Sequence, residues 1–198
     1  MSNLLHQPVT TCDLIAQALS RDLDRTVLIG VDGEVITARD MRDSISRFRQ
    51  LFEDLDPAPQ RAAVLARNRV EVIYSSHGLG FAGIVTTTLH PMGSVDDYLY
   101  VIDDANIDTL VYDANLYEDV AAELKERAPQ LRHFLSMGEG ATGRDIVAAS
   151  MAYEARPLVA SPTDPEALFR IAYSGGTTGK PKGIMCSHRS AVTSAILQ

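Results

Sequence analysis

A stretch near the carboxyl end of the chain, residues 174–182, combines the residue types that bind phosphate groups. Its glycines allow positive φ angles and let the backbone approach a ligand without an intervening Cβ. Backbone N–H groups that line a concave loop bind oxyanions, and serine and threonine hydroxyls add donors. Lys180 and Lys182 supply positive charge, and Pro181 between them stiffens the end of the loop. The candidate phosphate-binding residues are Ser174, Gly175, Gly176, Thr177, Thr178, Gly179, Lys180 and Lys182.

Two other interpretations fit this stretch less well. A plain surface loop is often rich in Gly, Ser and Thr, but paired lysines beside clustered glycines, between two apolar runs, favour a ligand-binding loop. A Walker-type loop, G-x-x-x-x-G-K-[ST], would require a glycine at Ser174 and a hydroxyl at Pro181. A proline there also argues against a helix that begins at the lysine. The apolar runs at 169–173 and 184–186 predict instead that the loop joins two strands.

The stretch from Tyr173 to Gly183 resembles the phosphate-binding signature of the adenylate-forming superfamily, which includes acyl-CoA synthetases, peptide-synthetase adenylation domains and luciferases. That signature is aromatic, Thr/Ser, Ser, Gly, Thr/Ser, Thr, Gly, any residue, Pro, Lys, Gly. Gly175 departs from it, because the family usually has a serine there; the departure removes one hydroxyl and keeps the backbone N–H. The matching residues are Tyr173, Ser174, Gly176, Thr177, Thr178, Gly179, Pro181, Lys182 and Gly183.

The resemblance implies that residues 1–198 are the N-terminal portion of the large domain of such an enzyme, similar to a fatty-acid–CoA ligase. In this family the loop closes over the β- and γ-phosphates of ATP while a carboxylate attacks the α-phosphorus. The implied cofactors are ATP, Mg²⁺ and CoA, and the implied partners are a small-molecule carboxylic acid, ATP and CoA. Two alternatives stay open: an acyl-AMP ligase that hands the acyl group to a carrier protein, and a non-catalytic nucleotide-binding module.

The resemblance also implies that the main catalytic residues lie beyond Gln198, with Lys182 in a supporting role. An aromatic-Gly-x-Thr-Glu segment, a Thr-Gly-Asp segment, a hinge and a small C-terminal domain with a catalytic lysine are expected there. We therefore expect the 198-residue chain to fold without forming acyl-adenylate by itself.

Charge is distributed unevenly along the chain, whose formal net charge is −8. All 26 acidic residues lie in residues 1–166, whereas residues 167–198 carry only basic charges. A net negative chain with one positive segment argues against nucleic-acid binding and suits a small anionic ligand. Apolar residues make up 45% of the chain, yet no apolar run is long enough to span a membrane and no signal peptide pattern begins the chain. These features predict a cytoplasmic protein.

Hydrophobic periodicity indicates the elements that must position the loop. Residues 12–21 predict a helix, and the turn signal Asp32–Gly33 between two β-branched runs predicts a small β-hairpin. Thr37 is the predicted N-cap of a long helix that ends before Pro57 and carries one apolar stripe.

From residue 61 onward, short apolar runs alternate with helical patterns, which predicts βαβ units. The expected fold class is thus α/β, a parallel sheet with flanking helices. Residues 136–145 are expected to be a loop because of their glycines, and Ser187 is the predicted cap of a final helix. The expected strands are 62–66, 83–89, 109–112 and 131–135, and the expected helices are 70–80, 95–105, 116–128 and 146–153.

The remaining polar candidates show no catalytic spacing. The five histidines lack a metal-ligand pattern, so no metal site is predicted, and His188 is expected to serve packing and helix capping. Cys12 and Cys186 are expected to be buried thiols without a partner. Asp103–Asp104 at the end of a predicted helix opposes the helix dipole, which indicates solvated charges without a further role.

Overall fold

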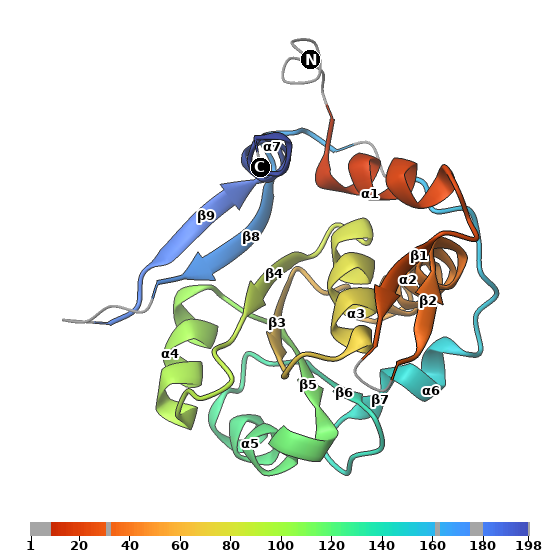
Figure 1. Cartoon of the computed structure of the whole chain (residues 1–198). Coiled ribbons are helices and arrows are strands. Elements are labelled where there is room, and N and C mark those ends of the chain that lie inside the picture. Colours follow the sequence, from red (N-terminus) through yellow and green to blue (C-terminus); the bar gives the residue numbers. More distant parts are fainter. Residues whose placement is uncertain (1–8, 31–32, 161–162, 175–179, 198) are drawn as a thin grey trace.

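The computed structural model describes residues 9–30, 33–160, 163–174 and 180–197. Two sheets are present among these residues: a two-stranded hairpin and a seven-stranded sheet flanked by helices (Figure 1). The expected α/β architecture with a small N-terminal hairpin is confirmed. Residue 32 of the expected hairpin turn lies outside the described residues.

The two N-terminal helices each begin at a capping threonine, and the second of these, Thr37, is the predicted one. Thr10 and Thr37 each accept a hydrogen bond from the N–H of an aspartate three residues on, and each aspartate bonds back to the threonine N–H. These reciprocal bonds satisfy helix donors that would otherwise lack partners. The hydrogen bonds from Thr37 also lower the pKa of Asp40. The N-terminal elements are α1 (Thr11–Ser20), β1 (Thr26–Ile29), β2 (Val35–Thr37) and α2 (Ala38–Glu53).

The large sheet has the strand order β7-β6-β5-β3-β4-β8-β9, in which every neighbouring pair is parallel except β8 and β9. The chain runs from β3 to β4 on one side and then crosses back to β5 on the other, so the strand order reverses between β3 and β5. The strands are β3 (Arg61–Leu65), β4 (Val85–Thr88), β5 (Thr109–Asp113), β6 (His133–Met137), β7 (Arg144–Asp145), β8 (Leu168–Tyr173) and β9 (Gly183–Ser187).

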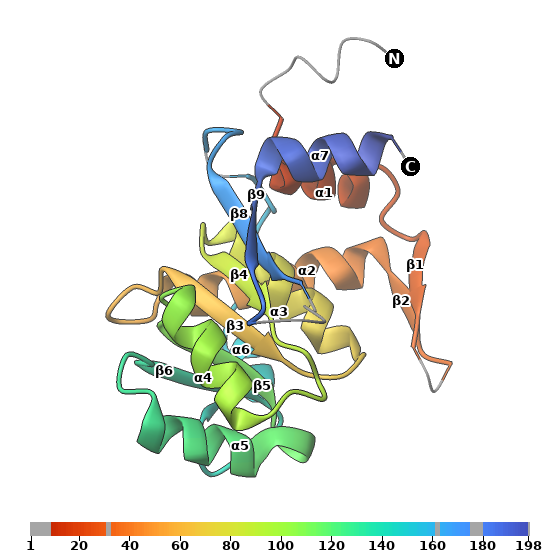
Figure 2. The same ribbon diagram turned by 90° about the vertical axis from the view of Figure 1, so that its left-hand side faces the viewer.

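Helices cover both faces of this sheet (Figure 1 and Figure 2). Ala63 and Leu65 of β3 pack in one cluster with buried residues of α4 and α5, whereas Ala62 and Val64 pack in another with residues of α2, α3 and α6. Successive side chains of a strand point to opposite faces, so the central strands are buried on both sides. The helices of this part are α3 (Val70–Phe81), α4 (Val95–Asp104), α5 (Ala114–Arg127), α6 (Ile146–Ser150) and α7 (His188–Ile196).

Several boundaries differ from the sequence-based expectation. The expected loop at 136–145 begins later, because β6 runs on to Met137, and it contains the two-residue strand β7, which pairs with β6 at the sheet edge. α5 begins at Ala114, since the Asp113 carboxylate caps it, and its backbone departs from helical geometry at Tyr117. The helix expected at 146–153 ends at Ser150. The differences at β7 and at the start of α5 come from strand pairing and capping rather than from periodicity.

The chain's first and last described helices lie side by side (Figure 2). The N–H of Thr11 at the start of α1 donates to His188 Nδ1 of α7 at 3.4 Å. α7 lies beside the β8–β9 hairpin, whereas Cys12 and Leu19 of α1 pack in a buried cluster with residues of α2 and α3 (Figure 1). No helix among the described residues is long and apolar enough to cross a membrane.

The crossing of α2 and α3 depends on Gly78, and this gives a first prediction. A Cβ at Gly78 would meet Phe48 Cβ at 2.8 Å and the backbone N of Arg49 at 3.1 Å. We expect Gly78→Ala to lower the free energy of unfolding by about 1–3 kcal/mol, because the helices must move apart. Urea denaturation measures this loss.

Gly80→Ala on the same helix is the matched control, since its Cβ would meet nothing closer than 3.4 Å. Alanine is the better helix former by about 1 kcal/mol, so this variant is expected to be at least as stable as the unaltered protein. Equal losses in both variants would contradict the proposed close contact.

The two cysteines are expected to differ in reactivity. Cys12 is 6% exposed, and its burial raises the pKa of the thiol to about 12, whereas Cys186 is only half-buried, contrary to the expectation that both are buried. The thiolate is the reactive species, so Cys12 should resist an aromatic disulfide reagent at pH 8. We expect one thiol to react quickly in the folded chain and two after denaturation. Rapid labelling that persists in Cys186→Ser would refute this assignment.

Candidate functional site

The predicted phosphate-binding loop leaves the sheet at the carboxyl end of β8 and returns as β9. The two strands are antiparallel with Tyr173 opposite Gly183, and the Ser174 N–H donates to the Lys182 carbonyl at 3.1 Å. The expectation that the loop joins two strands is confirmed. Ser174, Lys180 and Lys182 are exposed. The other candidates, Gly175, Gly176, Thr177, Thr178 and Gly179, lie outside the described residues.

This position matches where ligands bind in α/β sheets. β8 is parallel to β4, so its loop emerges at the same edge as the segments that follow β3, β4 and β5. Ligand sites of open α/β sheets lie outside the carboxyl ends of the strands. The loop therefore occupies the edge at which such sites are found.

Tyr173, the aromatic residue before the loop, is tied to helix α4. Its hydroxyl donates to Asp104 Oδ2 at 2.5 Å. Burial, together with the hydrogen bond to the Asp104 carboxylate, raises the pKa of Tyr173 above its ordinary value, so the phenol keeps its proton. The expectation that Asp104 is merely a solvated charge is thus wrong: one of its oxygens holds the residue at which the loop begins.

Gly183, the last residue of the signature, makes room for Tyr173. A Cβ at this position would lie 3.2 Å from both Cζ and Oη of the Tyr173 ring and 3.0 Å from Ile171 Cγ2. The two residues are cross-strand partners, so the ring lies over the glycine and reaches past it toward α4. Close approach of the tyrosine ring accounts for a glycine at this position.

The end of the loop also contacts α4, through Tyr100. The Tyr100 hydroxyl donates to the Pro181 carbonyl at 3.1 Å, and Lys180 Nζ lies 4.7 Å from the centroid of the Tyr100 ring. An ammonium over an aromatic face is attracted by the ring's quadrupole. Sequence reasoning missed Tyr100, because nothing in the local pattern of α4 indicates a contact with a loop about eighty residues further on.

The lysines keep their charge available for an anion. Among the residues that the structure describes, neither Lys180 nor Lys182 forms an ion pair with a carboxylate. Arg189, by contrast, is paired with Glu166. The positive charge at residues 167–198 is therefore partly neutralised at α7, whereas the loop lysines have no carboxylate partner in the part of the chain that the structure describes.

His188 packs behind the hairpin, as expected. It is 6% exposed, its ring centroid lies 4.9 Å from that of Phe169, and burial lowers the pKa of the imidazole. A neutral ring can accept the hydrogen bond from Thr11 N–H. This residue serves packing between α1, β8 and α7.

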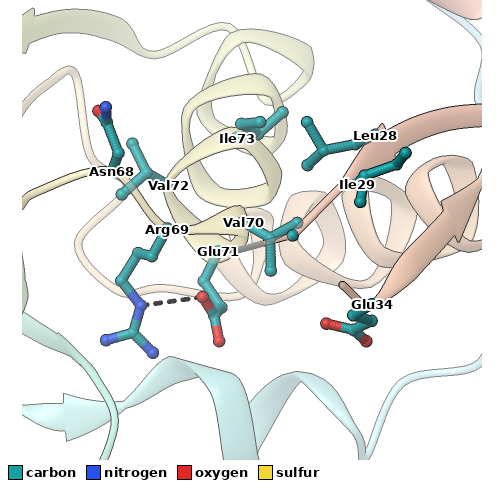
Figure 3. A pocket seen from close by; sticks show the side chains of 10 residues that line it. Leu28, Ile29, Glu34, Asn68, Arg69, Val70, Glu71, Val72 and Ile73 are labelled. Carbon is teal, nitrogen blue, oxygen red and sulfur yellow. Dashed lines mark hydrogen bonds and ion pairs between the residues drawn. The ribbon is translucent and has the colours of Figure 1, made fainter. Parts of the chain in front are cut away.

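A cavity of about 550 Å³ lies between the β1–β2 hairpin and the start of α3 (Figure 3). Its wall includes Arg69, whose guanidinium donates to Glu71 at 2.9 Å, to Asp113 at 2.8 Å and to the Met137 carbonyl at 3.0 Å. Arg69 and Glu71 lie in the segment that follows β3, Asp113 is the last residue of β5, and Met137 is the last residue of β6. Arg69 therefore links the carboxyl ends of three neighbouring strands. Because three of its five N–H donors are engaged by these partners, we assign Arg69 a structural role; the sequence analysis did not single it out.

The described residues contain no group of three or more His, Cys, Asp or Glu side chains that could hold a metal ion. The site that they outline is a lysine-bearing loop at the carboxyl edge of a largely parallel sheet, fixed to one helix at both ends. These features define an α/β domain with a candidate phosphate-binding loop.

Comparison with known proteins gives the family. The pattern of the family described as AMP-binding enzyme matches residues 15–198. The chain therefore belongs to the AMP-binding enzyme family, and the resemblance to the N-terminal part of adenylate-forming enzymes is confirmed.

Individual relatives agree with this assignment. The chain is 33% identical over 98% of its length to a medium/long-chain-fatty-acid–CoA ligase, FadD8, of Mycobacterium tuberculosis, and covers 35% of that protein. It is 25% identical over 85% of its length to a 4-hydroxybenzoate–CoA/benzoate–CoA ligase of Rhodopseudomonas palustris, and covers 33% of it. The crystal structure of an anthranilate CoA ligase, AuaEII, with anthranoyl-AMP has a TM-score of 0.86 at 20% identity; 96% of this chain and 36% of that chain are covered. The chain thus spans about a third of the length of each of these three proteins.

The contact between Tyr173 and Gly183 gives a testable prediction. We expect Gly183→Ala to lower the free energy of unfolding by about 1–3 kcal/mol, because the new Cβ displaces the tyrosine ring and Ile171. The same substitution in a Tyr173→Ala background should cost clearly less, since the ring is gone. Chemical denaturation of the four proteins measures the difference. Equal costs in both backgrounds would show that the ring does not set the requirement for glycine.

Proposed function

We propose that the protein containing this chain activates a carboxylic acid with ATP and then transfers the acyl group to CoA. Two observations support the proposal: the chain belongs to the AMP-binding enzyme family, and its signature stretch carries two lysines, Lys180 and Lys182, without carboxylate partners among the described residues. The single observation that carries it furthest is the position of this stretch at the carboxyl edge of the sheet. Localisation in the cytoplasm, where ATP and CoA are available, is part of the proposal.

In the first step a carboxylate oxygen attacks the α-phosphorus of ATP. The bond from this phosphorus to the bridging oxygen of the β-phosphate breaks, and pyrophosphate leaves with the electron pair. Negative charge therefore grows on the leaving group, and positioned donors near that charge lower the barrier. Ser174, Lys180 and Lys182 supply a hydroxyl and two cations for this purpose, together with the candidates Gly175, Gly176, Thr177, Thr178 and Gly179. Mg²⁺ would neutralise phosphate charge, as in other nucleotide sites.

The substrate class we propose is a fatty acid. The support is the similarity to the mycobacterial fatty-acid–CoA ligase, which exceeds that to the benzoate–CoA ligase. Acid-dependent ATP–pyrophosphate exchange by the full-length protein, measured with octanoate and with benzoate, tests the activity and the class together. We expect faster exchange with octanoate. Faster exchange with benzoate would overturn the fatty-acid assignment, and no exchange with a range of acids would overturn the activity.

The acceptor is tested in the second step. The full-length protein, given octanoate and ATP, is expected to form octanoyl-CoA from CoA. Transfer only to a phosphopantetheinylated carrier protein would identify an acyl-AMP ligase instead. The 198-residue chain alone is expected to give no exchange, because the main catalytic residues of the family are expected outside it.

Lys182 provides the sharpest test of the loop. A charge-assisted hydrogen bond is worth roughly 1.5–3 kcal/mol, so Lys182→Ala in the full-length protein should slow acid-dependent exchange about tenfold to a hundredfold. The matched control is Lys125→Ala on α5, which removes the same charge from a lysine that contacts the Thr142 carbonyl and the Phe134 ring instead of the loop. Equal rates in the two variants would contradict a role of Lys182 in the reaction.

A further inference from the structure

Helix α4 holds the phosphate-binding loop on both sides. At the start of the loop, Asp104 accepts the hydrogen bond from the Tyr173 hydroxyl at 2.5 Å. At its end, the Tyr100 hydroxyl donates to the Pro181 carbonyl at 3.1 Å, and the ring lies beneath the Lys180 ammonium at 4.7 Å. Figure 2 shows α4 next to the loop end of the β8–β9 hairpin.

The two α4 residues act from one face of the helix. Tyr100 and Asp104 are four residues apart, and residues at this spacing lie one above the other on a helix surface. They therefore present a hydroxyl and a carboxylate in a fixed relation to one another. The hairpin contributes a matching pair, the Tyr173 hydroxyl and the Pro181 carbonyl, from the two sides of the loop.

The helix itself is firmly anchored. Ser94 and Asp97 form reciprocal capping bonds at its start, and its opposite face buries Tyr98, Val101 and Ile102 in the core between α4, α5 and the sheet. A helix that is fixed by its core and its cap can serve as a rigid reference for a neighbouring loop.

We propose that Tyr100 and Asp104 are positioning residues for the nucleotide: they hold the two flanks of the phosphate-binding loop at the separation that suits the phosphates of ATP. We call this pair the α4 clamp. The proposal rests on the proposed function, because it assumes that the loop binds ATP.

The solvent exposure of the two clamp residues indicates that their hydrogen bonds position the loop and do not stabilise the fold. Asp104 is exposed and Tyr100 is half-buried, so neither hydrogen bond belongs to the core. Hydrogen bonds at the surface contribute little to the free energy of unfolding. These hydrogen bonds restrict the positions of residues 173 and 180–181. Binding of a ligand to a pre-organised loop costs less conformational entropy than binding to a loop that must first be ordered. Loss of the α4 clamp should therefore weaken ATP binding and leave binding of the acid unchanged.

The experiment compares two variants with two matched controls in the full-length protein. Tyr100→Phe removes the hydroxyl bond to Pro181 and keeps the ring, and Asp104→Ala removes the acceptor of Tyr173. Tyr98→Phe is the control for the first, since Tyr98 is on the same helix but its hydroxyl donates to the His90 carbonyl, in the segment before α4, and not to the loop. Asp103→Ala is the control for the second, because it removes a neighbouring exposed carboxylate.

We expect the two clamp variants to raise the Kd for Mg·ATP, measured by calorimetry, about threefold to tenfold, the loss that corresponds to one hydrogen bond. In ATP–pyrophosphate exchange with octanoate, the KM for ATP should rise by the same factor while the KM for octanoate stays constant. Without nucleotide, trypsin should cleave after Lys182 faster in the clamp variants than in the controls. Melting temperatures should match those of the controls.

The outcomes distinguish a failure of the α4 clamp hypothesis from a failure of the proposed function. If the unaltered protein exchanges pyrophosphate and the clamp variants match their controls in Kd, KM for ATP and cleavage after Lys182, the clamp is refuted and the proposed function stands. Equal rises in the KM for ATP and for octanoate would also refute it, since they indicate a general disturbance of the fold. If the unaltered protein neither binds Mg·ATP nor exchanges pyrophosphate, the proposed function itself fails.

Discussion

Burial of the central strands on both faces is the constraint on which the other features depend. Ala62 and Val64 face one layer of helices, and Ala63 and Leu65 face the other, so β3 carries no solvated side. Parallel strands that are buried in this way need helical crossovers, and every crossover begins from a loop at the carboxyl edge. The candidate site is therefore at that edge because the core is built from parallel strands. The antiparallel return of β9 lets the loop after β8 close on its own hairpin instead of leading into a helix.

Local chemistry made much of the fold predictable. The caps at Thr37 and Ser94 lie where hydroxyl and aspartate stand three residues apart, because the bonds that form them are made within one turn. Strand β7 was not predictable, since two residues carry no periodicity and form a strand only through their pairing with β6. The early start of α5 at Ala114 shows the same limit: the Asp113 cap ends a buried strand, and strand and cap signals overlap.

The candidate site also has one part that could be predicted from the sequence and one part that could not. Its loop was recognisable because the residue types that bind phosphate stand next to one another in the sequence, from Ser174 to Lys182. The residues that hold the loop were not, since Asp104 and Tyr173 are 69 positions apart and meet only through the packing of α4 against the sheet. The sequence indicated an unfavourable position for the Asp104 carboxylate, because a negative charge at the carboxyl end of a helix opposes the helix dipole. A carboxylate that looks misplaced within its own helix can have its partner on another element.

The link that Arg69 makes has a consequence for the order of folding. Its partners Asp113 and the Met137 carbonyl are 44 and 68 positions away, so the three groups meet only after β5 and β6 have joined β3. Closing such long chain segments is slow compared with forming a helix or a hairpin. The guanidinium therefore gains these two bonds late, and interactions that form late mainly slow unfolding and hardly change the rate of folding. Arg69 thus contributes to the lifetime of the folded sheet more than to the speed at which it assembles.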